Sequence, residues 1–293
     1  MRITNHITTG NSLHALQKSL RAMDDAQQRV TSGLRVEVAS DDPSAASSIV
    51  SSGASLRAID QYQRNINSAS ARIAVEEQSL NSLTQILERV KELAVSQGTS
   101  TASAQTRLIA KAEVDHLMQQ ALQLANQVHE GEFLFGGDQS NVAPLQTTTP
   151  PFTTTPPTGF RRAEISSGMY VRATHNATDV FLTTGVLAAI DQVSTALGND
   201  DAPAIRQSIF ALDAGHANVQ VLIGESGTQA AQLEVATSNL RALDTSLRTF
   251  KSNLQEADLE KAVSDLVSRQ TAYQAAMLAT SRVMGMNLTE YLR

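Results

Sequence analysis

A heptad pattern in the C-terminal third of the chain constrains the fold more than any other feature. Within residues 228–292, apolar side chains recur at alternating spacings of three and four, which is the seam of a coiled coil. One heptad position is occupied by Leu233, Leu240, Leu247 and Leu254, and the other by Ala236, Leu243, Phe250 and Ala257. The register slips near residues 256–258 and then resumes at Val263, Leu266, Tyr273 and Met277.

This C-terminal stripe needs partner helices. A helix of about 60 residues is about 90 Å long at about 1.5 Å per residue, and each buried Leu contributes roughly 1.5–3 kcal/mol. The only comparable stretches lie within residues 1–131. We therefore predict that the two ends of the chain pack together, while the middle of the chain is looped out.

Three further helices are expected in the N-terminal part. After an irregular stretch at 1–11, the first helix runs to Gly33, since glycine favours the left-handed conformation that ends a helix. The second begins with Asp42 as its cap and Pro43 as its first residue, and runs to about residue 97. The third covers about 104–130. The second helix repeats at Ile59, Ile66, Ile73, Leu80 and Leu87, and Glu76 interrupts its companion heptad position.

The composition changes between residues 132 and 184. Four of the seven prolines lie in a Thr/Pro-rich run at 147–157, which disfavours helix. Residues 160–181 resemble strands, with apolar side chains at Ala163, Ile165, Met169, Tyr170, Val171 and Val180. We expect a small β-rich module with a disordered loop. Helix resumes at about 185–197 and again at about 202, and Gly224 and Gly227 are expected to bend or break the later helix.

The expected fold is therefore mainly α, with long coiled-coil helices from both termini packed as a rod-like bundle and a small inserted β-rich module. We predict three parts. Residues 1–40 with 255–293 form a terminal coiled-coil segment, residues 41–131 with 185–254 form a helical bundle, and residues 132–184 form the inserted module.

Composition excludes several classes of function. The formal net charge is −6, which does not fit the basic surface of a nucleic-acid-binding protein. The chain has no cysteine, so it has no thiolate nucleophile and no cysteine-ligated zinc. No apolar run is long enough to span a membrane. The N-terminal residues lack the apolar core of a cleaved signal peptide, so we expect a cytoplasmic protein or export by another route.

No catalytic, cofactor-binding or metal-binding constellation is expected. Glu113 and His116 share a helical face, and His129 precedes Glu130, but solvated helix-face residues explain both pairs. Paired aspartates at 41–42 and 200–201 are explained by helix capping. A hydrolase that uses His116 or His129 remains a distant alternative.

The remaining candidate surface is apolar. The outermost helical segments are too thin to bury their stripes within one molecule, and exposed stripes of this length predict partner helices. The stripes consist of Leu13, Leu16, Leu20, Met23 and Val30 near one end, and Val263, Leu266, Tyr273 and Met277 near the other. The first segment is basic and residues 256–265 are acidic, which favours their pairing.

Three motifs resemble the signatures of flagellins and flagellar hook-associated proteins. The N-terminal motif is VTSGLR at 30–35 followed by SDDP at 40–43, and LERVKELA at 87–94 resembles a further helix of the family. The C-terminal motif combines EADL at 256–259, TAYQA at 271–275 and the ending LTEYL at 288–292. The resemblance covers about 1–135 and 185–293, and it adds Leu288, Tyr291 and Leu292 to the candidate assembly surface.

Within this family, three details resemble the members that join hook to filament. These are Pro43 in SDDP, the Phe-containing run GEFLFGG at 131–137, and the Tyr291-Leu292 ending. Two details depart from that pattern, namely the short Thr/Pro-rich module and MGM at 284–286. Two other interpretations stay open: a flagellin that forms the filament itself, and a cytoplasmic coiled-coil adaptor.

The resemblance implies a structural protein of the bacterial flagellum that needs no cofactor. Its terminal helices would line an inner tube, the helical bundle would form the next shell, and the β-rich module would face solvent. The implied partners are copies of the chain in a ring, hook-associated protein 1, flagellin, and an export chaperone on the C-terminal segment. Neither nucleic acid nor membrane is implied, and secretion would use the type III apparatus of the flagellum without a cleaved signal peptide.

Overall fold

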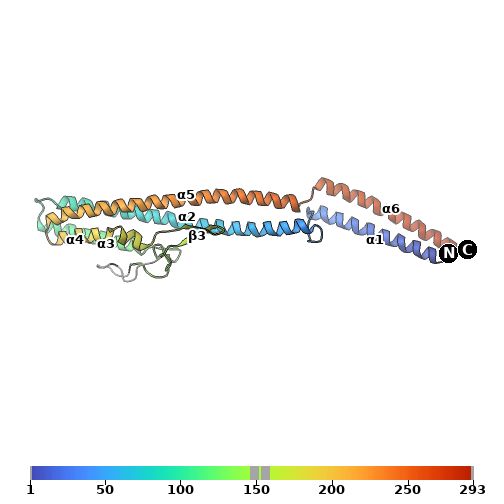
Figure 1. Cartoon of the computed structure of the whole chain (residues 1–293), viewed down its shortest axis with the longest axis horizontal. Coiled ribbons are helices and arrows are strands. Elements are labelled where there is room, and N and C mark those ends of the chain that lie inside the picture. Colours follow the sequence, from blue (N-terminus) through green and yellow to red (C-terminus); the bar gives the residue numbers. More distant parts are fainter. Residues whose placement is uncertain (1, 146–151, 153–158, 292–293) are drawn as a thin grey trace. The chain divides into compact units, whose positions relative to one another are not determined.

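The computed structural model describes residues 2–145, 152 and 159–291, with side chains in these ranges except at 2–6, 8, 9 and 283–291. Figure 1 shows a chain dominated by helices. The elements in order are α1 (Arg2–Ser32), α2 (Pro43–Gln97), α3 (Ala104–Ala125), β1 (Val128–His129), β2 (Glu132–Phe133), β3 (Arg162–Ser166), β4 (Met169–Arg172), the π-helix η1 (Thr178–Thr183), α4 (Val186–Gly198), α5 (Ala202–Gln255) and α6 (Leu259–Tyr291). The predicted fold class, mainly α with a small inserted β-rich module, is confirmed.

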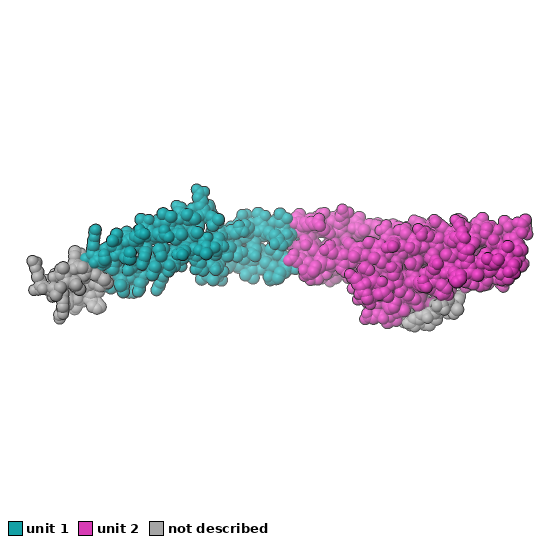
Figure 2. Space-filling view, turned by 180° about the vertical axis from the view of Figure 1, so that it is seen from behind, with its two compact units in different colours: residues 1–58, 243–293 teal, residues 59–242 magenta. Residues whose placement is uncertain are grey.

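The chain forms two compact units. Unit 1 contains residues 1–58 and 243–293, and unit 2 contains residues 59–242 (Figure 2). We predicted division at 40/41 and 254/255, close to the interruptions between α1 and α2 and between α5 and α6. The functional division into terminal segment, bundle and inserted module stays a prediction.

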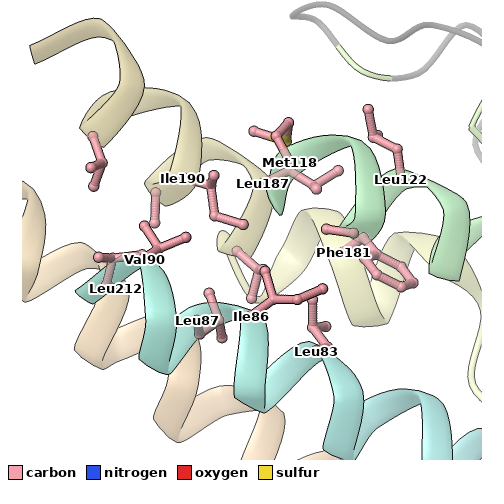
Figure 3. Close-up of a cluster of buried hydrophobic side chains, with 14 of the residues drawn as sticks. Leu83, Ile86, Leu87, Val90, Met118, Leu122, Phe181, Leu187, Ile190 and Leu212 are labelled. Carbon is pink, nitrogen blue, oxygen red and sulfur yellow. The ribbon is translucent and has the colours of Figure 1, made fainter. Parts of the chain in front are cut away.

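Unit 2 contains the main hydrophobic core. The predicted heptad residues of α2 are buried, and Leu80 and Leu87 among them belong to a cluster with residues of α3, η1, α4 and α5. Figure 3 shows this cluster, in which Leu83, Ile86, Leu87 and Val90 of α2 face Met118, Leu122, Phe181, Leu187, Ile190 and Leu212. The ring of Phe181 meets Phe135 edge to face, with centroids 5.4 Å apart. Burial of this seam is the reason that α2 keeps a regular heptad pattern.

A buried arginine joins the two turns at one end of this bundle. Arg107 of α3 donates from Nε to the carbonyl of Gln97 (3.1 Å) and from Nη2 to the carbonyl of Thr99 (2.9 Å). It also forms an ion pair with Asp200, which lies between α4 and α5. The single guanidinium thereby satisfies carbonyls of the α2–α3 turn and ties that turn to the α4–α5 turn.

Two small antiparallel hairpins lie at the start of the inserted module and within it. β1 pairs with β2, and β3 pairs with β4 with a bulge between Glu164 and Ser166. Gly168, with φ of 73°, allows the tight turn between β3 and β4. The expectation of strand structure is wrong at Val180, which is buried in η1. The expected disordered loop over the Thr/Pro-rich run lies outside the described residues, except for Phe152.

Two expected helix boundaries are wrong. α1 begins at Arg2 and not near residue 11, because pairing with α6 outweighs the weak helix propensity of the polar residues. α3 ends at Ala125 and not near residue 130. The chain turns there into the β1–β2 hairpin through Glu130 and Gly131, which both have positive φ.

The expected break at Gly224 and Gly227 is also wrong. Both glycines lie inside the continuous helix α5. A glycine inside a helix costs only about 1 kcal/mol relative to alanine, and the buried residues Val219 and Leu233 on either side hold this part of α5 in place. The predicted starts of α2, α4 and α5 are confirmed to within about two residues.

Candidate assembly interface

The link between α1 and α2 folds back onto the link between α5 and α6. We call residues 33–42 together with residues 254–257 the interhelix clasp. Gly33 ends α1 with φ of 69°, a left-handed conformation that glycine adopts without strain. Its carbonyl accepts from the backbone N–H of Ala257 (2.8 Å), and the N–H of Arg35 donates to the carbonyl of Gln255 (2.7 Å). Backbone hydrogen bonds therefore join the two links.

The side chain of Arg35 reinforces the clasp. Its Nη2 donates to the carbonyl of Leu254 (2.7 Å), and its Nη1 contacts Asp42 Oδ2 (3.1 Å). One guanidinium thus satisfies a carbonyl at the C-terminal end of α5 and pairs with the residue that caps α2. The arginine of the VTSGLR motif therefore holds together segments that lie 219 positions apart in the sequence.

Two adjacent aspartates shape the start of α2. Asp41 Oδ2 accepts from the N–H groups of Glu37 (3.0 Å) and Val38 (3.1 Å), which closes a turn. Asp42 Oδ1 accepts from the N–H of Ala45 (3.0 Å), so it is the N-cap of α2, as predicted. These hydrogen bonds lower the pKa of Asp41, and the bonds from Ala45, Ser44 and Arg35 lower the pKa of Asp42 to about 2.

Helix α6, which follows the clasp, begins with an aspartate N-cap, as α2 does. Asp258 Oδ1 accepts from the N–H groups of Glu260 (3.1 Å) and Lys261 (3.3 Å) at the start of α6. The EADL motif therefore contains the N-cap of α6, and the SDDP motif contains the N-cap of α2. Both motifs fix where a helix restarts after the clasp.

α1 and α6 pack against each other along their length (Figure 1). Unit 1 buries few apolar residues, and those among the described side chains are Ala26, Val36, Ala45 and Leu56. A pair of helices without a third partner leaves part of each apolar stripe in contact with water. The terminal helices therefore carry apolar surface that their pairing does not cover.

The structure places the predicted interface residues in three groups. Leu13, Leu20, Val263 and Met277 are 44%, 37%, 48% and 48% exposed, respectively. The residues Leu16, Met23, Val30, Leu266 and Tyr273 are half-buried. The side chains of Leu288, Tyr291 and Leu292 lie outside the described residues. Among the described side chains of α1 and α6, sequence reasoning missed four further exposed large apolar residues, which are Ile7, Leu259, Val267 and Leu278.

Within the described side chains, the predicted charge pairing between the two ends does not take the form of direct ion pairs. Among the described residues, Asp258 pairs with Lys261 and Asp265 pairs with Arg269, both within α6. Arg35 pairs with Asp42 inside the clasp. Apolar contact and the backbone hydrogen bonds of the clasp therefore hold α1 and α6 together in this structure.

A buried polar cluster in unit 2 escaped the sequence analysis. His175 Nδ1 donates to Glu76 Oε1 (2.6 Å), and the backbone N–H of His175 donates to the same oxygen (2.9 Å). His175 Nε2 lies 3.1 Å from Glu225 Oε2, which also accepts from Arg172 (2.8 Å). The cluster joins the inserted module to α2 and α5. The polar Glu76 at a heptad position was the only signal for it.

Glu113, which shares a helical face with His116, has an arginine as its partner. Glu113 accepts from Arg89 Nε (2.8 Å) and not from His116. No group of three or more possible metal ligands was found within the described ranges. Nor does any helix in those ranges combine the length and apolar character that a bilayer span requires.

Comparison with known families explains the clasp and the terminal helices together. The model of the bacterial flagellin N-terminal helical region matches residues 3–140, and that of the bacterial flagellin C-terminal helical region matches residues 209–292. Together these matches cover more than half of the chain. They include α1 and α6 and both links of the clasp.

Known relatives match over nearly their whole length. Flagellar hook-associated protein 3 of Salmonella typhimurium is 24% identical, with 100% of both chains covered. The flagellar filament 33 kDa core protein of Treponema phagedenis is 23% identical, covering 98% of this chain and 95% of the relative. Flagellar hook-associated protein 3 from Legionella pneumophila has the same fold, with a TM-score of 0.63 at 14% identity, covering 70% of this chain and 98% of that structure. The chain belongs to the bacterial flagellin family, whose N-terminal and C-terminal helical regions it carries at its two ends.

Proposed function

We propose that this chain is a structural subunit of the bacterial flagellum that forms the junction between hook and filament. The observation that carries this proposal is the full-length match to hook-associated protein 3, together with the flagellin regions at both ends. These relatives are named as flagellar components.

The exposed apolar surface of α1 and α6 supports assembly through the terminal helices. Leu13, Leu20, Val263 and Met277 would become buried against neighbouring subunits. Each fully buried aliphatic side chain contributes roughly 1.5–3 kcal/mol, so several together can drive association. We propose that copies of the chain form a ring in which residues 1–40 and 255–293 line an inner tube. The bundle of 41–131 with 185–254 would form the next shell, and 132–184 would face solvent.

The proposed neighbours follow from a junction position. Hook-associated protein 1 would contact the ring on the hook side, and flagellin would contact it on the filament side. We also propose secretion through the flagellar type III apparatus without a cleaved signal peptide, with a chaperone on the C-terminal segment before export. Catalysis, cofactors, nucleic acid and membrane have no part in this function.

A second candidate function is that of a filament subunit. The observation that favours it is the match over nearly the full chain to the Treponema phagedenis filament core protein. Filament and junction subunits would use the same apolar helices for assembly. Position along the flagellum, and not terminal structure, distinguishes the two functions.

A charge placed on the apolar surface of α6 tests the assembly proposal. Leu266 is half-buried on the predicted stripe, whereas Ser268 of the same helix is exposed. We expect Leu266→Asp to leave unit 2 folded but to abolish incorporation into flagella, because a buried unpaired charge is costly. Ser268→Asp adds the same charge and should assemble. The measurement is motility of a deletion strain that carries each variant, with immunoblots of sheared flagella and of culture medium.

The two variants also separate assembly from export. Leu266→Asp protein in the medium but not in flagella would support the assembly role of the stripe. Normal motility and normal incorporation of Leu266→Asp would contradict it.

A further inference from the structure

A groove lies between α2 and the β3–β4 hairpin of unit 2. Its volume is about 310 Å³. Three of the side chains that line it are cationic, namely Arg72, Arg161 and Arg162, and the uncharged polar ones are Asn65, Ser68 and Tyr170. The acidic lining residue, Glu164, accepts from the N–H of Gly168 in the hairpin turn (3.2 Å). We call this feature the arginine groove.

Arg72 is buried at the α2 side of the arginine groove. Its side chain is 2% exposed, and its Nη1 donates to Glu132 Oε2 (3.1 Å). Its Nε has no hydrogen-bond partner among the described residues. A guanidinium has five N–H donors, and buried donors are normally satisfied, so Arg72 keeps one unsatisfied buried donor in the side chain that lines the groove.

The arginines of the groove have too few nearby carboxylates. Arg161 pairs with the same Glu132 oxygen that Arg72 uses. Arg162 has no recorded ion pair within the described part of the chain. Burial and the neighbouring charge of Arg161 lower the pKa of Arg72, although Glu132 and, more weakly, Glu130 oppose this effect. A second anion near these guanidinium groups would therefore be stabilised.

We propose that the arginine groove binds a carboxylate or phosphate oxyanion. Guanidinium groups bind such oxyanions through charge-assisted, often bidentate hydrogen bonds. The volume lies at the lower end of the range for small-molecule sites, so it accommodates an organic group that carries the anion. The partly exposed ring of Tyr170 would contact that group. The anion comes either from a free small molecule or from an acidic side chain of a second copy of this chain.

Titration with inorganic phosphate and with citrate tests the site directly. The full chain is titrated at constant ionic strength while the amide NMR signals of residues 65–72 and 161–173 are followed. We expect saturable shifts at both segments. Arg162→Gln should weaken binding by about tenfold, the typical effect of losing one charge-assisted hydrogen bond. Arg64 is the neighbour of Asn65 in α2, but it does not line the groove. Arg64→Gln removes the same charge, and this variant should bind the anions as the wild type does.

Sedimentation velocity distinguishes the two sources of the anion. If an acidic side chain of a second copy fills the groove, phosphate and Arg162→Gln will both weaken self-association, whereas Arg64→Gln will not. If a free anion is the ligand, saturable shifts will occur without a change in association. The proposal is overturned if neither effect is seen, or if Arg162→Gln and Arg64→Gln behave alike in both measurements.

Discussion

Four residues of the interhelix clasp each have a specific role toward the backbone. Gly33 supplies the left-handed conformation, Arg35 satisfies a carbonyl of α5, and Asp41 and Asp42 accept from N–H groups of the turn and of α2. The helix cap at Asp42 was predictable because capping depends on a few adjacent residues. The hydrogen bond from Arg35 to the carbonyl of Leu254 was not predictable, because no local sequence pattern indicates which distant carbonyl an arginine reaches.

The cap at Asp42 gives the first prediction at this scale. Asp42→Ala removes the hydrogen bond to Ala45 and the ion pair with Arg35, so the melting temperature should fall. Asp42→Asn keeps an acceptor for the cap, so its melting temperature should fall less than that of Asp42→Ala. Asp25→Ala, on the exposed surface of α1, is the control. Equal melting temperatures for Asp42→Ala and Asp25→Ala in a calorimetric scan would show that the cap does not stabilise unit 1.

His175 gives a prediction about pH. Burial by itself lowers the pKa of His175, but the hydrogen bond and charge of Glu76, and then the hydrogen bond of Glu225, outweigh burial and the charge of Arg172. The net pKa of His175 is therefore raised. Its protonated form stabilises the fold fully below the unfolded pKa of about 6.5, and this stability is lost as the pH rises through the folded pKa.

The stability of unit 2 should therefore decrease as the pH rises through the raised pKa of His175. We expect the melting temperature of the wild type to fall over this range more than that of His175→Gln. In Glu225→Gln the ring should titrate at lower pH, because one carboxylate partner is gone. Histidine ring NMR signals followed against pH measure the shift. A His175 ring that titrates at or below the ordinary histidine value would refute the assignment of a stabilising imidazolium.

At the scale of elements, heptad spacing predicted the helices that share a core. The repeat from Ile59 to Leu87 identified the buried face of α2, and the terminal stripes identified α1 and α6 as helices. Boundaries were predicted less well, because pairing with α6 extends α1 and a two-residue turn at Glu130 and Gly131 shortens α3. Such tertiary effects do not appear in local spacing.

The core of unit 2 gives a prediction at the element scale. Leu87 of α2 is buried against α3, α4 and α5, whereas Leu108 of α3 is half exposed. Leu87→Ala should lower the free energy of unfolding by about 2–5 kcal/mol through lost burial and a residual cavity. Leu108→Ala makes the same chemical change at the surface and should lower the free energy of unfolding much less. Urea unfolding measures both, and similar losses would contradict the assignment of Leu87 to the core.

At the scale of the whole molecule, the sequence supported the fold class and the family, because both rest on patterns at the chain ends. The signatures at 30–43 and 256–259 are distinctive because the clasp needs glycine, arginine and aspartate at fixed positions. The arginine groove and the His175 cluster could not be predicted. Both bring together residues of α2 and of the inserted module, whose strands carry no strong local signal.

The central claim is that the chain assembles where hook meets filament, and immunogold labelling of intact flagella tests it most directly. Antibodies against the chain are applied to whole cells and viewed by electron microscopy. We predict gold confined to one site at the hook–filament boundary of each flagellum. Gold along the whole shaft would instead identify a filament subunit, and flagella without any gold would contradict the flagellar assignment of the chain.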